Sequence, residues 1–416
     1  MTTAQEPSTD YVQLLDPALR PDPYPLFARI REAGPFRIGT APVVVFSSHA
    51  DCTAVLRDPR VSVDRSLATL QMDAMPLYTA SKMPGEQVKP SFLFLDPPDH
   101  TRLRRLVSKA FTPRVVRQLE PRITEIVDDL LDKRSAAGTF DAVAEFAYPL
   151  PVTVICELLG VPLEDEAQLS HWSALLARTL DPTSRRAAEF RADPAELTRA
   201  GTELSDYFEK LTERRRATPG PDLLSQLIAA EDAGDMLSHQ ELISTCALLL
   251  IAGHETTVNL ISNALLALLR RPHELAALRA NPARAQGIVE ETLRFDPPVQ
   301  LMPRIAADAF TVGGIDIARG DLLVMLIAAA QRDPAVYPDP DRFDPTRESR
   351  HLSFGLGAHF CLGAPLARLE ARVALTRFAR RVPAPRLLAD PPPYRDHVNL
   401  RGPAHLPIGF TEILPE

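Results

Sequence analysis

The sequence has few cysteines, and their spacing excludes the sites that paired cysteines build. The four cysteines lie far apart and form no CxxC pair, so we predict neither a disulfide framework nor a zinc or iron–sulfur site of clustered thiols. Isolated cysteines agree better with a reducing, cytoplasmic setting than with secretion. They are Cys52, Cys156, Cys246 and Cys361.

Other familiar signals are also missing. Residues 1–10 contain neither a basic region nor an apolar run, so we expect no signal peptide and no membrane anchor. Lys and Arg number 46 against 54 Asp and Glu, and the resulting net charge of −8 excludes a dedicated nucleic-acid binder. No GxGxxG motif is present, so we expect no flavin segment in this chain.

The composition is that of a folded globular protein, with 45% hydrophobic and 24% charged residues over 416 positions. No repeat, low-complexity stretch or block of like charges divides the chain. The 40 prolines fall between helical patterns rather than in a linker. We therefore predict one domain over residues 1–416.

Apolar residues at helical spacing dominate the chain, as in residues 115–132. Two stretches favour strands instead. These are residues 35–46, with three consecutive valines, and residues 309–327, where Gly313-Gly314 can turn one strand onto the next. The sequence thus predicts a mainly α fold with a small β region.

The longest predicted helix opens at Ser238, with Glu241 completing a capping box, and ends before Pro272. About 30 residues span on the order of 45 Å, enough to cross a domain. Its middle is apolar around the whole circumference, so we expect a central, buried helix. A second helix is predicted from Asn281, which a proline follows, to just before Asp296.

The strongest chemical signal is the segment 354–364, which reads FGLGAHFCLGA. Cys361 stands behind a glycine-rich loop and just before an amphipathic helix, and the free N–H groups at a helix start favour thiolate over thiol. The glycines let the backbone lie flat against a large planar ligand, while Phe354 can shield the sulfur from water. The alternative is an inert, buried cysteine beside a turn.

This segment resembles the haem-binding loop of the cytochrome P-450 family, the haem-thiolate monooxygenases. Two spaced glycines follow the phenylalanine, a basic residue stands two positions before the cysteine, and a glycine stands two after it. The resemblance implies the P-450 fold, with the long central helix over the haem. It also implies haem b as cofactor and Cys361 as the axial iron ligand. Four neighbours would contact the haem: Phe354, Gly355, His359 and Gly363.

A second family motif, AGHETT at residues 252–257, falls in the middle of the long helix. In the family, Ala252 and Gly253 leave space for O₂ beside the haem, Thr256 supplies a hydroxyl, and Glu255 relays protons. Many members carry Asp at the position that Glu255 occupies here. Alternatively, Thr256 bonds the carbonyl one turn earlier and Glu255 pairs with a nearby basic side chain. His254 is expected to be a spacer and not a ligand.

Two further sets of residues support the resemblance. The pair Glu291 and Arg294, at i and i+3, would be buried and locked to an arginine of a proline-rich segment, here Arg342, in a structural role. A basic quartet would hold the two haem propionates, the alternative being four unrelated surface cations. Its members are His100, Arg104, Arg304 and His359.

The resemblance implies NAD(P)H-dependent insertion of one atom of O₂ into an apolar organic substrate. A separate ferredoxin and ferredoxin reductase would deliver the electrons, and the basic face formed by Arg102, Arg105 and Lys109 would dock the ferredoxin. A haem-thiolate peroxygenase or isomerase, and a non-catalytic haem sensor or ligand carrier, remain alternatives. Neither a membrane nor a nucleic acid is expected as a partner.

The expected pocket wall is apolar, and its methionines favour an adaptable pocket. The wall would come from residues 65–95, 172–190 and 299–302 and from Leu248, Ile251, Ala252 and Leu400, with methionines at Met72, Met75, Met83 and Met302. The same methionines could equally fill the core. The sequence contains no readable code for a particular substrate.

Overall fold

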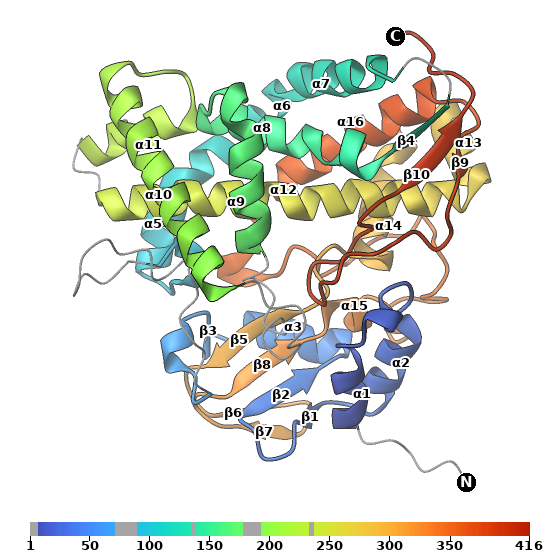
Figure 1. The fold of residues 1–416 in the computed structure, drawn as a ribbon. Helices are drawn as coiled ribbons and strands as arrows, with labels where there is room; N and C mark the ends of the chain where they lie inside the picture. Colours follow the sequence, from blue (N-terminus) through green and yellow to red (C-terminus); the bar gives the residue numbers. More distant parts are fainter. Residues whose placement is uncertain (1–6, 71–89, 135–137, 178–192, 233–236) are drawn as a thin grey trace.

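The computed structural model describes residues 7–70, 90–134, 138–177, 193–232 and 237–416. A large helical part surrounds α12, and a smaller part built on a sheet carries the N-terminal helices (Figure 1). The predicted mainly α fold with a small β region is confirmed. None of the helices in the described ranges combines the length and apolar character that crossing a bilayer requires.

The helices account for most of the chain. In chain order they are α1 Pro7–Gln13, α2 Tyr24–Glu32, α3 His49–Arg57, α5 Asp99–Ser108, α6 Pro113–Gln118, α7 Glu120–Asp132, α8 Pro149–Leu159, α9 Glu166–Ala177, α10 Pro194–Ala217, α11 Leu223–Asp232, α12 His239–Leu269, α13 Pro272–Ala280, α14 Arg284–Phe295, α15 Ile327–Ala330 and α16 Ala364–Arg381.

The strands form small sheets. They are β1 Phe36–Arg37, β2 Val43–Phe46, β3 Val61–Ser62, β4 Gly138–Asp141, β5 Met302–Ala306, β6 Phe310–Val312, β7 Ile315–Ile317, β8 Leu322–Met325, β9 Arg386–Leu387 and β10 Pro407–Phe410. The largest sheet has the order β1-β2-β8-β5-β3, in which β2 and β8 are parallel and the other neighbours antiparallel. A separate hairpin, β6-β7, turns at Gly313-Gly314 as predicted, with both glycines at positive φ.

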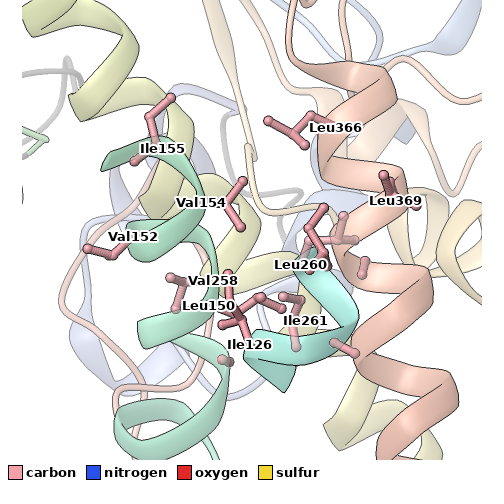
Figure 2. Close-up of a cluster of buried hydrophobic side chains, with 14 of the residues drawn as sticks. Ile126, Leu150, Val152, Val154, Ile155, Val258, Leu260, Ile261, Leu366 and Leu369 are labelled. Atoms are coloured by element: carbon pink, nitrogen blue, oxygen red, sulfur yellow. The ribbon is translucent and has the colours of Figure 1, made fainter. Parts of the chain in front are cut away.

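Helix α12 is the central helix that the sequence predicted. Its capping box is present, because the Ser238 side chain accepts a hydrogen bond from the N–H of Glu241 and the Glu241 side chain accepts one from the N–H of Ser238. Almost every side chain along it is buried. Apolar side chains of α12, α7, α8 and α16 gather in one buried cluster, which includes Leu260, Leu150 and Leu369 (Figure 2).

Two predicted helix boundaries were wrong, and prolines or turns explain both. Residues 115–132 form α6 and α7 rather than one helix, because a proline in the first turn of α7 cannot continue the α6 hydrogen-bond ladder and the chain breaks at Leu119. Helix α14 begins at Arg284 instead of Pro282. Asn281 caps a turn before it, accepting from the N–H of Ala283 at 3.2 Å and, through its carbonyl, from that of Arg284 at 3.1 Å.

The buried ion pair between Glu291 and Arg294 fastens the proline-rich segment to α14. The Arg294 Nη2 to Glu291 Oε1 distance is 2.7 Å, and both side chains are at most 1% exposed. Arg294 also donates to the carbonyl oxygens of Pro340 and Arg342, at 2.8 and 3.1 Å. The expected side-chain partner Arg342 was wrong, because its side chain is 68% exposed and pairs with Asp344. Arg347 takes that place, with Nε 3.6 Å from Glu291.

We expect Glu291→Gln to lower stability strongly, because it leaves the Arg294 guanidinium buried with no anion. Breaking such a pair costs about 3–5 kcal/mol. The control is Glu120→Gln, whose pair with Arg372 is about 40% exposed on both sides and contributes below about 1 kcal/mol. Thermal unfolding of the two variants measures the difference. Equal losses of stability would contradict the structural role of the buried pair.

Candidate active site

A cavity of about 350 Å³ lies where α12, β5 and the loop before α16 meet. Most of the predicted site residues line it, although they are far apart in the sequence. Those lining it are Arg104, Ala252, Gly253, Thr256, Arg304, Phe354, Gly355, His359, Cys361 and Gly363. His100 and Glu255, which belong to the same prediction, are not among the lining residues.

The loop around Cys361 folds as its glycines require. Gly355 and Gly357 have φ values of +67° and +71°, a left-handed conformation that other residues rarely adopt. These turns bring the chain back so that the N–H of Cys361 donates to the carbonyl of Phe354 at 2.8 Å. Helix α16 starts three residues later, which leaves its first N–H groups beside the sulfur.

The surroundings of the Cys361 sulfur act in opposite directions on its proton. Burial raises the pKa of the thiol above its usual value and outweighs the hydrogen bonds from the N–H groups of Gly363 and Ala364 and the nearby charge of Arg104, which lower it. The helix-start effect predicted from the sequence is therefore present. A bound metal cation would add a further and larger attraction for the thiolate.

The AGHETT motif of α12, residues 252–257, contributes two small residues and a hydroxyl group to the cavity wall. Thr256 lines the cavity, and its Oγ1 donates to the Ala252 carbonyl at 3.1 Å, which is the alternative bond considered from the sequence. At Gly253, a Cβ atom would lie 3.3 Å from Ile155 of α8, so this glycine also permits the close approach of two helices. His254 lies away from the cavity, with Nδ1 3.0 Å from the carbonyl of Leu250.

Glu255 points away from the cavity wall and is held by basic side chains. One carboxylate oxygen bonds the Arg395 guanidinium, and the other lies 3.6 Å from Nε2 of His254. Burial by itself raises the pKa of Glu255, but His254, Arg395 and His397 more than compensate and lower it to about 2. The side chain is therefore a carboxylate at neutral pH, paired as the alternative interpretation supposed.

The predicted basic quartet is brought together at one end of the cavity. The rings of His100 and His359 lie 4.0 Å apart between centroids. Arg304 donates to the carbonyl of its neighbour Pro303 at 2.8 Å, and Arg104 to that of Phe360. Within the described residues, both ring nitrogens of His100 and Nε2 of His359 are buried with no hydrogen-bond partner.

Within the described residues no carboxylate binds Arg104 or Arg304, and burial together with the neighbouring charges disfavours the protonated form of both histidines. Burial lowers the pKa of Arg304 to about 10, against the charge of Asp96, which raises it. Burial and the charges of His100, Arg304 and Arg104 lower the pKa of His359 to about 3. Two carboxylates placed here would relieve both effects. The unpartnered nitrogens and the cavity beside Cys361 therefore fit a haem, whose two propionates these residues would hold.

The expected pocket wall is partly correct. Leu248, Val299, Leu301, Met302 and Leu400 line the cavity as predicted. Ile251 is buried in the core, and Trp172 packs against Tyr207 and donates to Glu203 at 2.7 Å, so neither is among the described lining residues. Met72, Met75 and Met83 and the stretch 178–190 lie outside the described residues.

Sequence reasoning missed several lining residues. They include Phe111, Ile155 and Glu370, whereas Arg65 and Phe92 line the cavity within the predicted stretch 65–95. Glu370 carried a usable signal, since it follows Leu366 by one helical turn and so shares its apolar face. Phe111 and Ile155 come from segments that only the tertiary fold brings to the cavity.

Comparisons with known proteins agree with this geometry. A family model described as cytochrome P-450 matches residues 35–382. Cytochrome P-450 107B1 of Saccharopolyspora erythraea is 41% identical over 98% of this chain and 99% of that protein. Vitamin D(3) 25-hydroxylase of Pseudonocardia autotrophica is 41% identical over 93% of each. The ligand-free crystal structure of CYP164A2 from Mycobacterium smegmatis is 52% identical over 97% of this chain and 100% of that chain, with a TM-score of 0.89.

We expect Arg304→Met to weaken haem retention while leaving the fold intact, because Arg304 is a half-buried cation that no carboxylate of the described residues binds. A hydrogen bond to a charged group contributes about 1.5–3 kcal/mol, so haem should transfer to an acceptor apoprotein roughly tenfold faster or more. Arg319→Met, at an exposed arginine of the β7–β8 turn, is the control. Equal transfer rates in both variants would exclude Arg304 as a propionate ligand.

Proposed function

The chain belongs to the cytochrome P-450 family, a family of haem b monooxygenases, and we propose that it oxygenates a moderately large, mostly apolar organic molecule with electrons from a separate ferredoxin and reductase. The observation that carries the proposal is a single apolar cavity shared by Cys361, the α12 motif and the basic residues. NAD(P)H would supply the electrons through the two partner proteins.

The substrate class follows from the wall of the cavity. Most lining side chains beyond the Cys361 loop are aliphatic or aromatic, as expected for a site that binds by apolar burial. Polar groups are few, with Arg65 stacked over Phe94 at 4.9 Å and Asn399 at another place in the wall. The 41% identical relative named for hydroxylation of vitamin D(3) supports a large apolar substrate for this chain also.

Each site residue has a proposed task. Cys361 would hold the haem iron, while His100, Arg104, Arg304 and His359 would bind the two haem carboxylates. The bound haem would supply the redox chemistry that activates O₂. Thr256 would donate a hydrogen bond into the cavity in place of its present bond to Ala252.

Glu255 would relay protons toward that hydroxyl. Its present contacts impose a condition, since it is ionised and bound to Arg395. It can therefore pass a proton on only after it has accepted one and turned away from Arg395.

We expect Thr256→Ala to keep haem and substrate binding yet divert reducing equivalents to peroxide, because the change removes a proton-delivery contact without removing packing. Loss of a positioned proton-transfer group costs on the order of 10²-fold in that step. Product formed per NAD(P)H consumed is the measurement. Thr257→Ala is a matched control, since Thr257 makes the same kind of bond to the Gly253 carbonyl at 3.2 Å. An unchanged product yield in Thr256→Ala would refute the role.

The proposed ferredoxin-binding surface contains fewer basic residues than the sequence suggested. Arg102 does not belong to a free basic face, because it binds the buried carboxylate of Glu241 at 2.7 Å and Asp99 at 2.9 Å. Arg105 and Lys109 are exposed on the same segment. That segment lies beside the Cys361 loop, which the bond from Arg104 to Phe360 shows. An acidic ferredoxin docked there would be close to the thiolate.

Charge reversal at Arg105 and Lys109 should raise the apparent KM for ferredoxin and flatten its dependence on salt, because steering by surface charge is screened over about 8 Å at physiological ionic strength. Arg319→Glu removes a similar exposed charge far along the chain and serves as the control. Substrate-induced spectral shifts should be the same in all variants. Ferredoxin-supported reduction that is unaffected by the reversal would place the docking surface elsewhere.

A further inference from the structure

Two basic side chains contact the ring of Phe354, the residue that opens the Cys361 loop. The guanidinium carbon of Arg368 lies 4.5 Å from the ring centroid. The ring of His351 lies 5.6 Å away between centroids. The backbone of Phe354 is bonded to the cysteine, because its carbonyl accepts a hydrogen bond from the N–H of Cys361 at 2.8 Å. The two basic groups therefore lie beside the loop that carries the sulfur.

One carboxylate holds both basic groups. The two oxygens of Glu290, in α14, accept from Nε and Nη2 of Arg368 at 2.6 and 3.0 Å, a bidentate geometry that fixes the orientation of the guanidinium. Nε2 of His351 lies 3.0 Å from Oε2 of the same carboxylate. Burial by itself raises the pKa of Glu290, but His351 and Arg368 outweigh it and lower the pKa to about 2. Glu290 is therefore an anion at neutral pH.

Arg368 is fixed in place although its side chain is 35% exposed. The salt bridge to Glu290 and the stacking over Phe354 both restrict the guanidinium, and a planar guanidinium suits both contacts. Arg372, one turn further along α16, offers a comparison on the same helix. It is 41% exposed and bonds Glu120 through one nitrogen, at 3.0 Å.

The positive end of this cluster faces the Cys361 loop. Arg368 and His351 contact the ring of Phe354, whereas the carboxylate binds them from α14. The charge of Arg368 acts on the sulfur, because burial raises the pKa of Cys361 and the charges of Arg104 and Arg368 oppose this rise. Arg368 does so from outside the cavity, since it is not among the described lining residues.

A fixed positive charge favours the form of a site that carries more negative charge. Reduction of a bound haem adds one electron, so a cation held near the thiolate stabilises the reduced form and raises the reduction potential. Groups that do not touch the metal commonly tune metal sites in this way. The charge of Arg104 would be taken up by a haem carboxylate, whereas Arg368 lies outside the basic quartet.

We propose that Arg368, held by Glu290 over Phe354, raises the reduction potential of haem bound through Cys361. Arg368 acts through Cys361 and is thus a positioning residue, not a catalytic one. One electron enters from the partner proteins, and no bond is formed or broken at Arg368. The inference rests on the proposed function only in requiring a haem held by Cys361, and not on the substrate, the proton relay or the ferredoxin-binding surface.

The first test measures the reduction potential of the haem-loaded protein by titration with redox dyes, without partner proteins or substrate. In Arg368→Met the ratio of ferrous to ferric haem at a fixed potential should fall roughly fivefold, the effect of one unit charge about 4 Å away in bulk water. Arg372→Met is the matched control and should titrate like the native protein. Equal potentials in the native protein and Arg368→Met would overturn the proposal.

The ferrous–CO spectrum of each sample separates this inference from the proposed function. If the native protein has no thiolate band, the assignment of Cys361 fails, and the proposal fails with it. If the band is present and the potential of Arg368→Met is unchanged, only the role of Arg368 is refuted.

A second variant separates charge from packing. Arg368→Lys keeps the positive charge but can neither bond bidentately nor stack as a flat group, so its potential should lie between those of the native protein and Arg368→Met. Arg368→Gln, which also lacks the charge, replaces the Met variant if that variant fails to take up haem. A potential in Arg368→Lys as low as that of the uncharged variant would contradict an effect of charge.

A double-mutant cycle tests the part of Glu290. Because Glu290 holds the guanidinium beside the loop, Arg368→Met should change the potential less in a Glu290→Gln background than in the native one. The same change in both backgrounds would show that Glu290 does not position Arg368, and would overturn the proposal in its present form.

Discussion

Two half-buried arginines at an apolar cavity, Arg104 and Arg304, with no carboxylate of the described residues bound to either, are the constraint on which the site depends. Arg304 bonds only a neighbouring carbonyl, and imidazole nitrogens of His100 and His359 are buried without partners. Burial, and after it the charges of His100, Arg304 and Arg104, lower the pKa of His359 to about 3. A folded protein tolerates such a cluster when a dianionic group completes it, and haem, whose iron Cys361 would hold, is such a group.

The residues that line the cavity are held in place by contacts that lie outside it. Helix α12 is capped at its start and buried along its length by α8 and α16 (Figure 2), so the strip with Ala252, Gly253 and Thr256 cannot be displaced easily. The Glu291 and Arg294 pair fastens the proline-rich segment that precedes the Cys361 loop. Arg368 extends this support, because it binds Glu290 and lies 4.5 Å over the ring of Phe354. Rigidity outside the cavity thus places the reactive groups inside it.

The sequence was sufficient for features that depend on local chemistry. The capping box at Ser238, the hairpin at Gly313-Gly314 and the loop before α16 were predicted because each uses neighbouring residues whose geometry is fixed by residue type. Contacts between residues that are far apart in the chain could not be predicted in this way. The pairing of Glu255 with Arg395 and that of Arg102 with Glu241 join segments about 140 residues apart, and nothing local to either residue indicates them. Arg347 was missed in favour of Arg342 for a related reason, since only the path of the folded segment decides which arginine faces Glu291.

The most direct test of the whole account is the ferrous–CO absorption spectrum of the haem-loaded protein with and without Cys361. The account predicts a strongly red-shifted thiolate band in the native protein and in Cys52→Ala, a buried cysteine outside the cavity. It predicts loss of that band in Cys361→Ala, with haem still taken up because Arg104, Arg304 and His359 remain. A thiolate band that survives in Cys361→Ala would contradict the central claim.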